Sequence, residues 1–109
     1  MDPCTLFACE SQPIVLEGLR RVVESSEEFR LSGHSSGIDD ALEPIASLLP
    51  SIVLLDRITG WRQVQHFIAE LKEVSPQSRC VLWGNDLTAS ECYRALQSGV
   101  RGVFVRSEP

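Results

Sequence analysis

Asp56 is the residue in this sequence with the clearest potential for chemistry, because it ends the apolar run Ile52–Leu55. A carboxylate that follows a core segment is costly to bury unless it is paired, hydrogen-bonded or bound to a metal. Glu10 stands in the same relation to an earlier apolar run, Leu6–Cys9. Since hard cations favour carboxylate oxygens, Glu10 and Asp56 could together hold Mg²⁺.

Each of these acids also has a purely structural interpretation. Asp56 could form an ion pair at the end of a strand with Arg57 or Arg106, and Glu10 could be an exposed residue ahead of a helix. Ser11 is expected to cap that helix, since serine is favoured at N-caps. Perturbed acids cluster at functional sites, but structural ion pairs also produce them, so both interpretations stay open at this point.

The elements that must position these acids alternate between strands and helices. The predicted strands are residues 6–9, 29–34, 52–55, 80–83 and 103–105. The predicted helices are residues 13–24, 38–49, a third with its apolar face at 64–71, and a fourth that runs from the capping box at 88–91 to Gly99.

Two of these helices carry a specific expectation. The apolar face of the first consists of Val15, Leu19, Val22 and Val23. The second contains Pro44, and an interior proline removes one backbone hydrogen bond and clashes with the preceding turn. We therefore expect the second helix either to kink or to begin near Glu43.

Strands that alternate with helices predict an α/β domain with a doubly wound, five-stranded parallel sheet. The uniformly apolar run before Asp56 agrees with this, because strands of a parallel sheet are covered on both faces. In such folds, ligands bind at the carboxyl ends of the strands. Glu10, Asp56, Gly84 and Arg106 each follow a strand-like run, so we expect them to converge on one edge of the sheet.

Three stretches together resemble the receiver domain of bacterial response regulators, especially the branch that carries a LuxR-type DNA-binding domain. ESQPIVLEGLRRVV resembles the acidic pair and first helix, and PSIVLLD resembles the strand that ends on the phosphate-accepting aspartate. ALQSGVRGVFVR resembles the fourth helix, the fifth strand and the lysine position. The resemblance implies a flavodoxin-like receiver domain over residues 1–109 that lacks the family's last helix. We expect the parent protein to continue past residue 109 into a DNA-binding domain.

The resemblance also implies a chemistry. In that family a histidine kinase passes a phosphoryl group to the aspartate, and Mg²⁺ held by the aspartate and the acidic pair offsets the negative charge. By position, Asp56 matches the phosphoacceptor, Glu10 the first acid and Ser11 the second. Gly84 falls at the family's hydroxyl position, and Arg106 falls at its lysine position.

Three of these positions depart from the family's pattern. Ser11 is neutral where the family has a metal-binding acid, and Gly84 has no hydroxyl to draw toward a phosphoryl group. Arg106 keeps the positive charge, but a planar guanidinium is not interchangeable with an ammonium. The sequence therefore supports a phosphorylatable receiver that controls transcription. It equally supports a pseudo-receiver, which uses the same fold as a phosphorylation-independent interaction or dimerisation module.

Composition narrows the remaining function classes. A net charge of −5 argues that this chain does not itself bind a nucleic-acid backbone, so DNA would be bound only through a domain outside it. No apolar run approaches the roughly 20 residues that span a bilayer, and no secretory signal is visible, which favours a cytoplasmic protein. An enzyme is disfavoured, because no nucleophile–base pair or Gly-rich phosphate loop is present.

Two further expectations concern the role of the four cysteines and the oligomeric state of the chain. Cys4, Cys9, Cys80 and Cys92 form no CxxC pair, and we interpret them as small hydrophobic residues rather than zinc ligands. A receiver fold without its last helix exposes apolar surface on one side, which favours self-association and predicts a homodimer.

Overall fold

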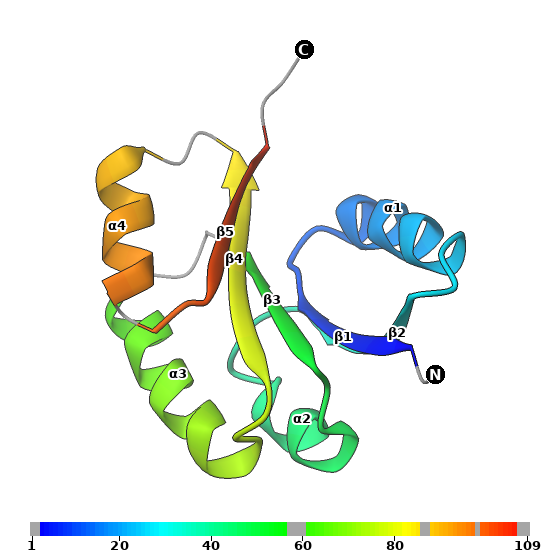
Figure 1. The fold of residues 1–109 in the computed structure, drawn as a ribbon, viewed down its shortest axis with the longest axis horizontal. Coiled ribbons are helices and arrows are strands. Elements are labelled where there is room, and N and C mark those ends of the chain that lie inside the picture. The colour runs from blue at the N-terminus through cyan, green and yellow to red at the C-terminus, as the bar shows by residue number, and fades with distance from the viewer. Residues whose placement is uncertain (1–2, 57–60, 86–87, 98, 107–109) are drawn as a thin grey trace.

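The computed structural model describes residues 3–56, 61–85, 88–97 and 99–106, apart from the side chains of Asn85 and of residues 104–106. Within these residues, five strands alternate with four helices (Figure 1). The strands are β1 (Cys4–Cys9), β2 (Phe29–Ser35), β3 (Ile52–Asp56), β4 (Arg79–Asn85) and β5 (Gly102–Arg106). The helices are α1 (Pro13–Glu24), α2 (Leu42–Leu48), α3 (Trp61–Val74) and α4 (Ala89–Gln97).

All neighbouring strands pair in parallel, in the order β2-β1-β3-β4-β5. The predicted doubly wound parallel sheet is therefore confirmed. From β1 the chain builds outward to β2 on one side and then returns to add β3, β4 and β5 on the other. The order reverses between β1 and β3, which is where ligands bind in folds of this kind.

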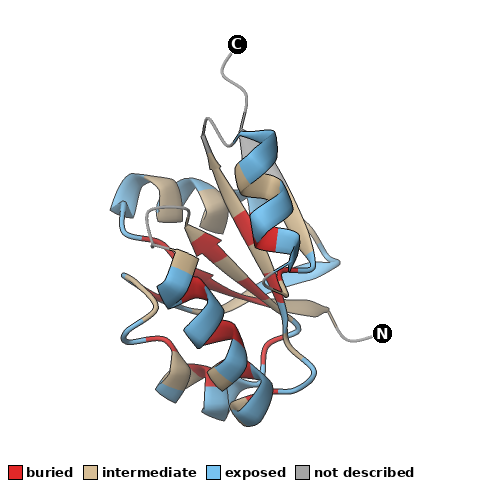
Figure 2. Cartoon of the chain, turned by 90° about the vertical axis from the view of Figure 1, so that its left-hand side faces the viewer, coloured by how far each residue is buried: buried red, intermediate tan, exposed pale blue. Residues whose placement is uncertain are grey.

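The main core lies on the side of the sheet that α2, α3 and α4 cover. Val53 and Leu55 of β3 are fully buried, and they pack with Ile45 of α2, Val64 of α3 and Ala95 of α4. Figure 2 views the molecule from this side and shows buried residues on the strands and inner helix faces, with exposed residues on the outside. Burial under three helices explains Val53 and Leu55, whereas Ile52 and Leu54, which alternate with them, are half-buried.

α1 lies on the opposite face of the sheet, apart from the other three helices (Figure 1). Among the described residues, the main core cluster includes no side chain from α1. The bounds of α1 agree with the prediction, but its apolar face is only partly buried. Val23 is 5% exposed, whereas Val22 is 68% exposed. Val22 thus shares the predicted apolar face but stays exposed, because no described element covers α1 on that side.

The ends of α2 and α4 follow the local signals in the sequence. α2 begins at Leu42 and places Pro44 in its first turn, where a missing N–H is tolerated, so the helix starts close to the expected position. At α4, the N–H of Glu91 donates to Thr88 Oγ1 at 3.1 Å and the N–H of Thr88 donates to Glu91 Oε1 at 3.1 Å. These two bonds confirm the capping box. None of the helices described is long and apolar enough to span a membrane.

Candidate functional site

The carboxyl ends of β1 and β3 bring Glu10 and Asp56 to the same edge of the sheet. Cys9 is the register partner of Leu55, and each acid follows directly after one of these two residues. Glu10 and Asp56 therefore leave the sheet at the same level, beside the point where the strand order reverses. This juxtaposition follows from the parallel register and agrees with the sequence-based expectation.

Each of the two carboxylates accepts a hydrogen bond from the segment between β1 and α1. Ser11 Oγ donates to Asp56 Oδ2 at 3.1 Å, and the backbone N–H of Gln12 donates to Glu10 Oε1 at 3.1 Å. The backbone N–H of Glu10 donates to the carbonyl oxygen of Ser35 at 2.9 Å, which ties this segment to the end of β2. The site is therefore a set of fixed carboxylates rather than two loose surface acids.

Two structural expectations for this segment are wrong. Ser11 does not cap α1, because Gln12 occupies the N-cap position without a side-chain cap bond and the hydroxyl of Ser11 is directed to Asp56. Glu10 is not an exposed residue ahead of the helix, since it is only 7% exposed. The hydrogen bond of its backbone to Ser35 holds Glu10 against the sheet and accounts for its burial.

A hollow of about 210 Å³ opens beside Asp56. Its lining residues are Cys9, Ser11, Ser36, Gly37, Ile38, Asp39, Asp56 and Gln63. Asp39 comes from the segment after β2, and Gln63 comes from the first turn of α3. Neither residue was predicted from the sequence, because neither directly follows a strand-like apolar run. The position of β2 beside β1 was the available signal, since the segment after β2 must reach the same edge.

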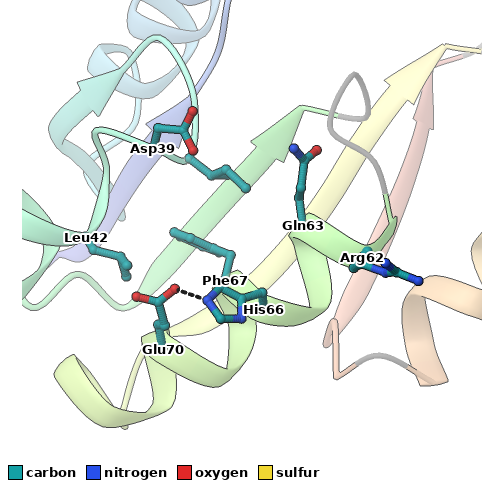
Figure 3. Close-up of a pocket in the computed structure, with 8 residues that line it drawn as sticks. Asp39, Leu42, Arg62, Gln63, His66, Phe67 and Glu70 are labelled. Atoms are coloured by element: carbon teal, nitrogen blue, oxygen red, sulfur yellow. Dashed lines mark ion pairs between the residues drawn. The ribbon is translucent and has the colours of Figure 1, made fainter.

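A second hollow, of about 420 Å³, lies between α2 and α3 and shares Ile38, Asp39 and Gln63 with the first. Figure 3 shows Leu42 and Phe67 directed toward it and Arg62 directed away from it. His66, to which the sequence assigned no role, pairs through Nε2 with Glu70 Oε1 at 2.9 Å. The recessed surface around Asp56 therefore continues between the two helices.

Gly84 and Arg106 lie at the same edge of the sheet by backbone position. Asp56 is the register partner of Trp83, so Gly84 lies one residue further along β4. Gly84 pairs with Val105, and Arg106 pairs with Asn85 at the end of β5. Arg57 and the side chain of Arg106 lie outside the described residues, so the predicted ion pairs of Asp56 with these arginines stay predictions.

Comparison with known proteins agrees with this geometry. No protein-family model matches the chain. It is 24% identical over 98 residues, 90% of its length, to the response regulator protein VraR of Staphylococcus epidermidis. It is 21% identical over 105 residues, 96% of its length, to the nitrate/nitrite response regulator protein NarL of Escherichia coli. These matches cover 47% and 49% of the relatives, so the chain spans about half the length of the curated relatives it matches.

A solved structure settles the fold. The signal receiver domain of the response regulator NarL from Mycobacterium tuberculosis superposes with a TM-score of 0.85 at 22% identity. The superposition covers 100% of this chain and 88% of that domain. The chain has the receiver fold of response regulators. The resemblance identified from the three sequence stretches is thereby confirmed, and Asp56 and Glu10 occupy the edge of a receiver sheet.

Receiver domains of this kind generally bind Mg²⁺, and the donor set at this edge fits such an ion. The described residues contain no cluster of three or more His, Cys, Asp or Glu side chains suited to a metal. Mg²⁺, however, keeps several waters and is usually bound through only one or two carboxylates. Glu10 and Asp56 supply two, and Ser11 supplies a neutral oxygen where a third carboxylate would strengthen the site.

The buried thiols take no part in this chemistry. Burial raises the pKa of Cys9 to about 11, although a hydrogen bond with Ser35 opposes the shift. Burial, with a smaller effect of nearby Cys9, raises the pKa of Cys80 to about 12. Since the thiolate is the reactive form, both side chains are inert at neutral pH. The interpretation of these two cysteines as small buried hydrophobic residues is confirmed.

Proposed function

We propose that this chain is the receiver domain of a response regulator that controls transcription in a two-component pathway, and that Asp56 is its phosphoacceptor. The observation that carries the proposal is the placement of Asp56 and Glu10 side by side, where the strand order of a receiver sheet reverses. The hollow of about 210 Å³ beside Asp56 leaves room for a phosphoryl group to approach. As a signalling domain of this kind, the chain is not an enzyme.

In the proposed reaction an Asp56 carboxylate oxygen attacks the phosphorus of a phosphohistidine on a histidine kinase. The phosphorus–oxygen bond forms as the phosphorus–nitrogen bond breaks, and the histidine leaves with the bonding electron pair. Glu10 and Asp56 would hold Mg²⁺, which supplies positive charge against the phosphoryl oxygens when bound. The N–H of Gln12 orients the Glu10 carboxylate for this role, since it donates to Glu10 Oε1. We assign Arg106 to the lysine position, where its positive charge would face the phosphorylated carboxylate.

A second candidate function is a pseudo-receiver that interacts with partners without phosphorylation. The hydrogen bond from Ser11 to Asp56 favours it, because this bond satisfies one carboxylate oxygen with a neutral group and needs no metal. The glycine at position 84 favours it too, because the side chain that would sense a phosphoryl group is missing. In this alternative, Asp56 stabilises the start of α1 and signalling depends on surface contacts alone.

Incubation with acetyl phosphate and Mg²⁺, followed by intact mass measurement, tests the proposal. A receiver should gain the mass of one phosphoryl group, and hydroxylamine should remove it, because an acyl phosphate is labile to that nucleophile. Asp56→Asn should abolish the gain. Asp39→Asn is the matched control, because Asp39 lines the same hollow and should leave the gain intact. No mass gain, together with no Mg²⁺ binding in a titration, would instead support the pseudo-receiver.

The partners of the whole protein follow from the same proposal. We propose a histidine kinase as phosphodonor, a cytoplasmic location, and DNA binding by a domain outside this chain. The formal charge of −5 makes the chain itself a poor ligand for a nucleic-acid backbone. We also propose that the chain forms a homodimer, since α1 leaves apolar side chains exposed on its face of the sheet.

A further inference from the structure

The hollow of about 420 Å³ between α2 and α3 has the size of a small-molecule site. Pockets that bind small ligands occupy about 300–1,000 Å³, and they combine an apolar lining with a few polar groups. The walls of this hollow come from α2, α3 and the segment that leads from β2 into α2. All three belong to the middle of the sequence and cover the same face of the sheet.

The floor of the hollow is apolar and held by the core. Figure 3 shows Leu42 of α2 and Phe67 of α3 directed into the hollow. Phe67 is only 3% exposed and belongs to the main core cluster, and the half-buried Ile38 and Leu42 pack against that cluster. The floor is therefore formed before any ligand arrives. An apolar group placed on it would leave water, which favours binding.

Two carboxylates line the same hollow from different elements. Asp39 comes from the segment between β2 and α2, and Glu70 comes from α3. His66 Nε2 lies 2.9 Å from Glu70 Oε1 and orients this carboxylate. Arg62 carries a permanent positive charge, but Figure 3 shows its side chain directed away from the hollow. The hollow therefore presents negative charge beside an apolar floor.

We propose that the hollow between α2 and α3 binds a small organic cation, an amine with an aromatic or aliphatic body. The body lies on the floor formed by Leu42 and Phe67, and the ammonium group lies beside Asp39 and Glu70. Both parts of the ligand are needed. An anion would be repelled by the carboxylates, and a neutral apolar molecule would gain nothing from them.

The position of this site gives it a possible influence on the rest of the domain. Asp39 and Gln63 line this hollow and also the hollow beside Asp56. A bound amine would therefore lie next to the proposed phosphorylation site without occupying it. The inference itself does not depend on phosphorylation, because its evidence is the shape and the charge of the hollow between the helices.

Titration of the isotope-labelled chain with phenethylamine, followed in two-dimensional amide NMR spectra, tests the site. The amide signals of residues that line the hollow should shift and saturate, with a dissociation constant of about 1 mM or tighter for a ligand of this size. Phenethyl alcohol has the same ring and chain but no charge, and it should bind about threefold more weakly or worse. Ethylamine has the charge without the ring and should give no saturable shifts up to about 10 mM.

The ratio of the amine affinity to the alcohol affinity tests the two carboxylates. Asp39→Asn and Glu70→Gln should each lower this ratio, and the double variant should bring it close to one. A general disturbance of the hollow would change both affinities and leave the ratio unchanged. Glu24→Gln is the matched control, because it removes the same charge from α1 on the other face of the sheet (Figure 1). The contact between His66 and Glu70 is lost in one variant, but the two side chains are 79% and 44% exposed, so its effect on folding is small.

Each contrary result overturns a defined part of the inference. If phenethylamine gives no saturable shifts up to about 10 mM, there is no such site. Shifts centred on α1 or α4 overturn its location, and equal affinities for the amine and the alcohol overturn a cationic ligand. If Glu24→Gln lowers the ratio as much as Asp39→Asn does, net charge alone attracts the amine. Asp39→Asn should lose discrimination for the amine while it keeps the mass gain from acetyl phosphate, so failure here and failure of the proposed function are distinguishable.

Discussion

Replacing Ser11 by aspartate should destabilise the folded chain without Mg²⁺ and make its stability respond to the ion. The hydroxyl of Ser11 lies 3.1 Å from Asp56 Oδ2, so a carboxylate at position 11 would sit at about 4 Å from it. At that separation two like charges repel by about 1 kcal/mol in water and about 4 kcal/mol at an effective dielectric of 20. Because Ser11 is exposed and Asp56 is half-buried, we expect about 1–2 kcal/mol of repulsion.

The lost hydrogen bond adds to this repulsion. A hydrogen bond to a charged group contributes about 1.5 kcal/mol or somewhat less at an exposed site. The free energy of unfolding should therefore fall by about 2–3 kcal/mol in total. In a domain of this length, that loss lowers the melting temperature by roughly 10 °C or more. Mg²⁺ at about 100 times its dissociation constant stabilises the native state by about 2.7 kcal/mol and should recover most of the loss.

Thermal unfolding of Ser11→Asp with and without Mg²⁺, at matched ionic strength, is the measurement. Ser11→Asn is the control, because it removes the hydroxyl without adding a charge and should gain no response to Mg²⁺. If Ser11→Asp melts at the same temperature as Ser11→Asn in the absence of the ion, position 11 does not face Asp56 as described. If Mg²⁺ fails to raise the melting temperature of Ser11→Asp, Glu10 and Asp56 do not form a metal site.

Three further predictions concern the buried cysteines and two glycines. The folded pKa values of Cys9 and Cys80, about 11 and about 12, exceed the ordinary value of 9.0, so the thiols lose their protons more readily in the unfolded chain. The stabilising contribution of the two protonated thiols is thus complete below about pH 9 and declines as the pH rises toward 11. Urea denaturation over this pH range should show the decline. If Cys9 and Cys80 were alkylated faster than the half-exposed cysteines in the folded chain, their burial would be contradicted. Gly99→Ala should cost about 1 kcal/mol or more, because its φ is +106° and a Cβ would lie 3.2 Å from Ile68 Cγ2. Gly18→Ala should stabilise the folded chain by up to about 1 kcal/mol, because alanine favours a helix and a Cβ there meets nothing within 4 Å. Thermal unfolding measures both glycine substitutions, and equal effects on the melting temperature would contradict these two predictions.

The elements of the fold were predictable because their signals are local. α1 follows Pro13 and an apolar spacing of 3.6 residues, and its bounds agree with the prediction. The apolar run that precedes Asp56 marked β3, and two of its residues, Val53 and Leu55, are buried under three helices. The buried face of α1 was less predictable, since Val22 has the right spacing and is still exposed. Spacing identifies an apolar face, but the rest of the structure decides whether anything covers it.

The site was predictable in position and not in detail. The strand ends place Glu10 and Asp56 at one edge, and this follows from the alternation of strands and helices alone. The role of Ser11 did not follow, because the local preference of serine for an N-cap loses here to a hydrogen bond with a residue 45 positions away. Asp39 and Gln63 were missed for a related reason, as they reach the hollow from segments with no distinctive pattern.

The hydrogen bond between Ser11 and Asp56 links the two parts of the molecule on which the proposals rest. Ser11 lies two residues before Pro13, where α1 begins, and Asp56 ends β3 in the middle of the sheet. A phosphoryl group or metal ion bound at Asp56 Oδ2 would alter this hydrogen bond. A change at this bond would reach the start of α1 directly, since Ser11 lies two residues before Pro13. Because Gly84 has no hydroxyl to relay a signal along β4, this hydrogen bond is a direct link between the Asp56 carboxylate and the segment that leads into α1.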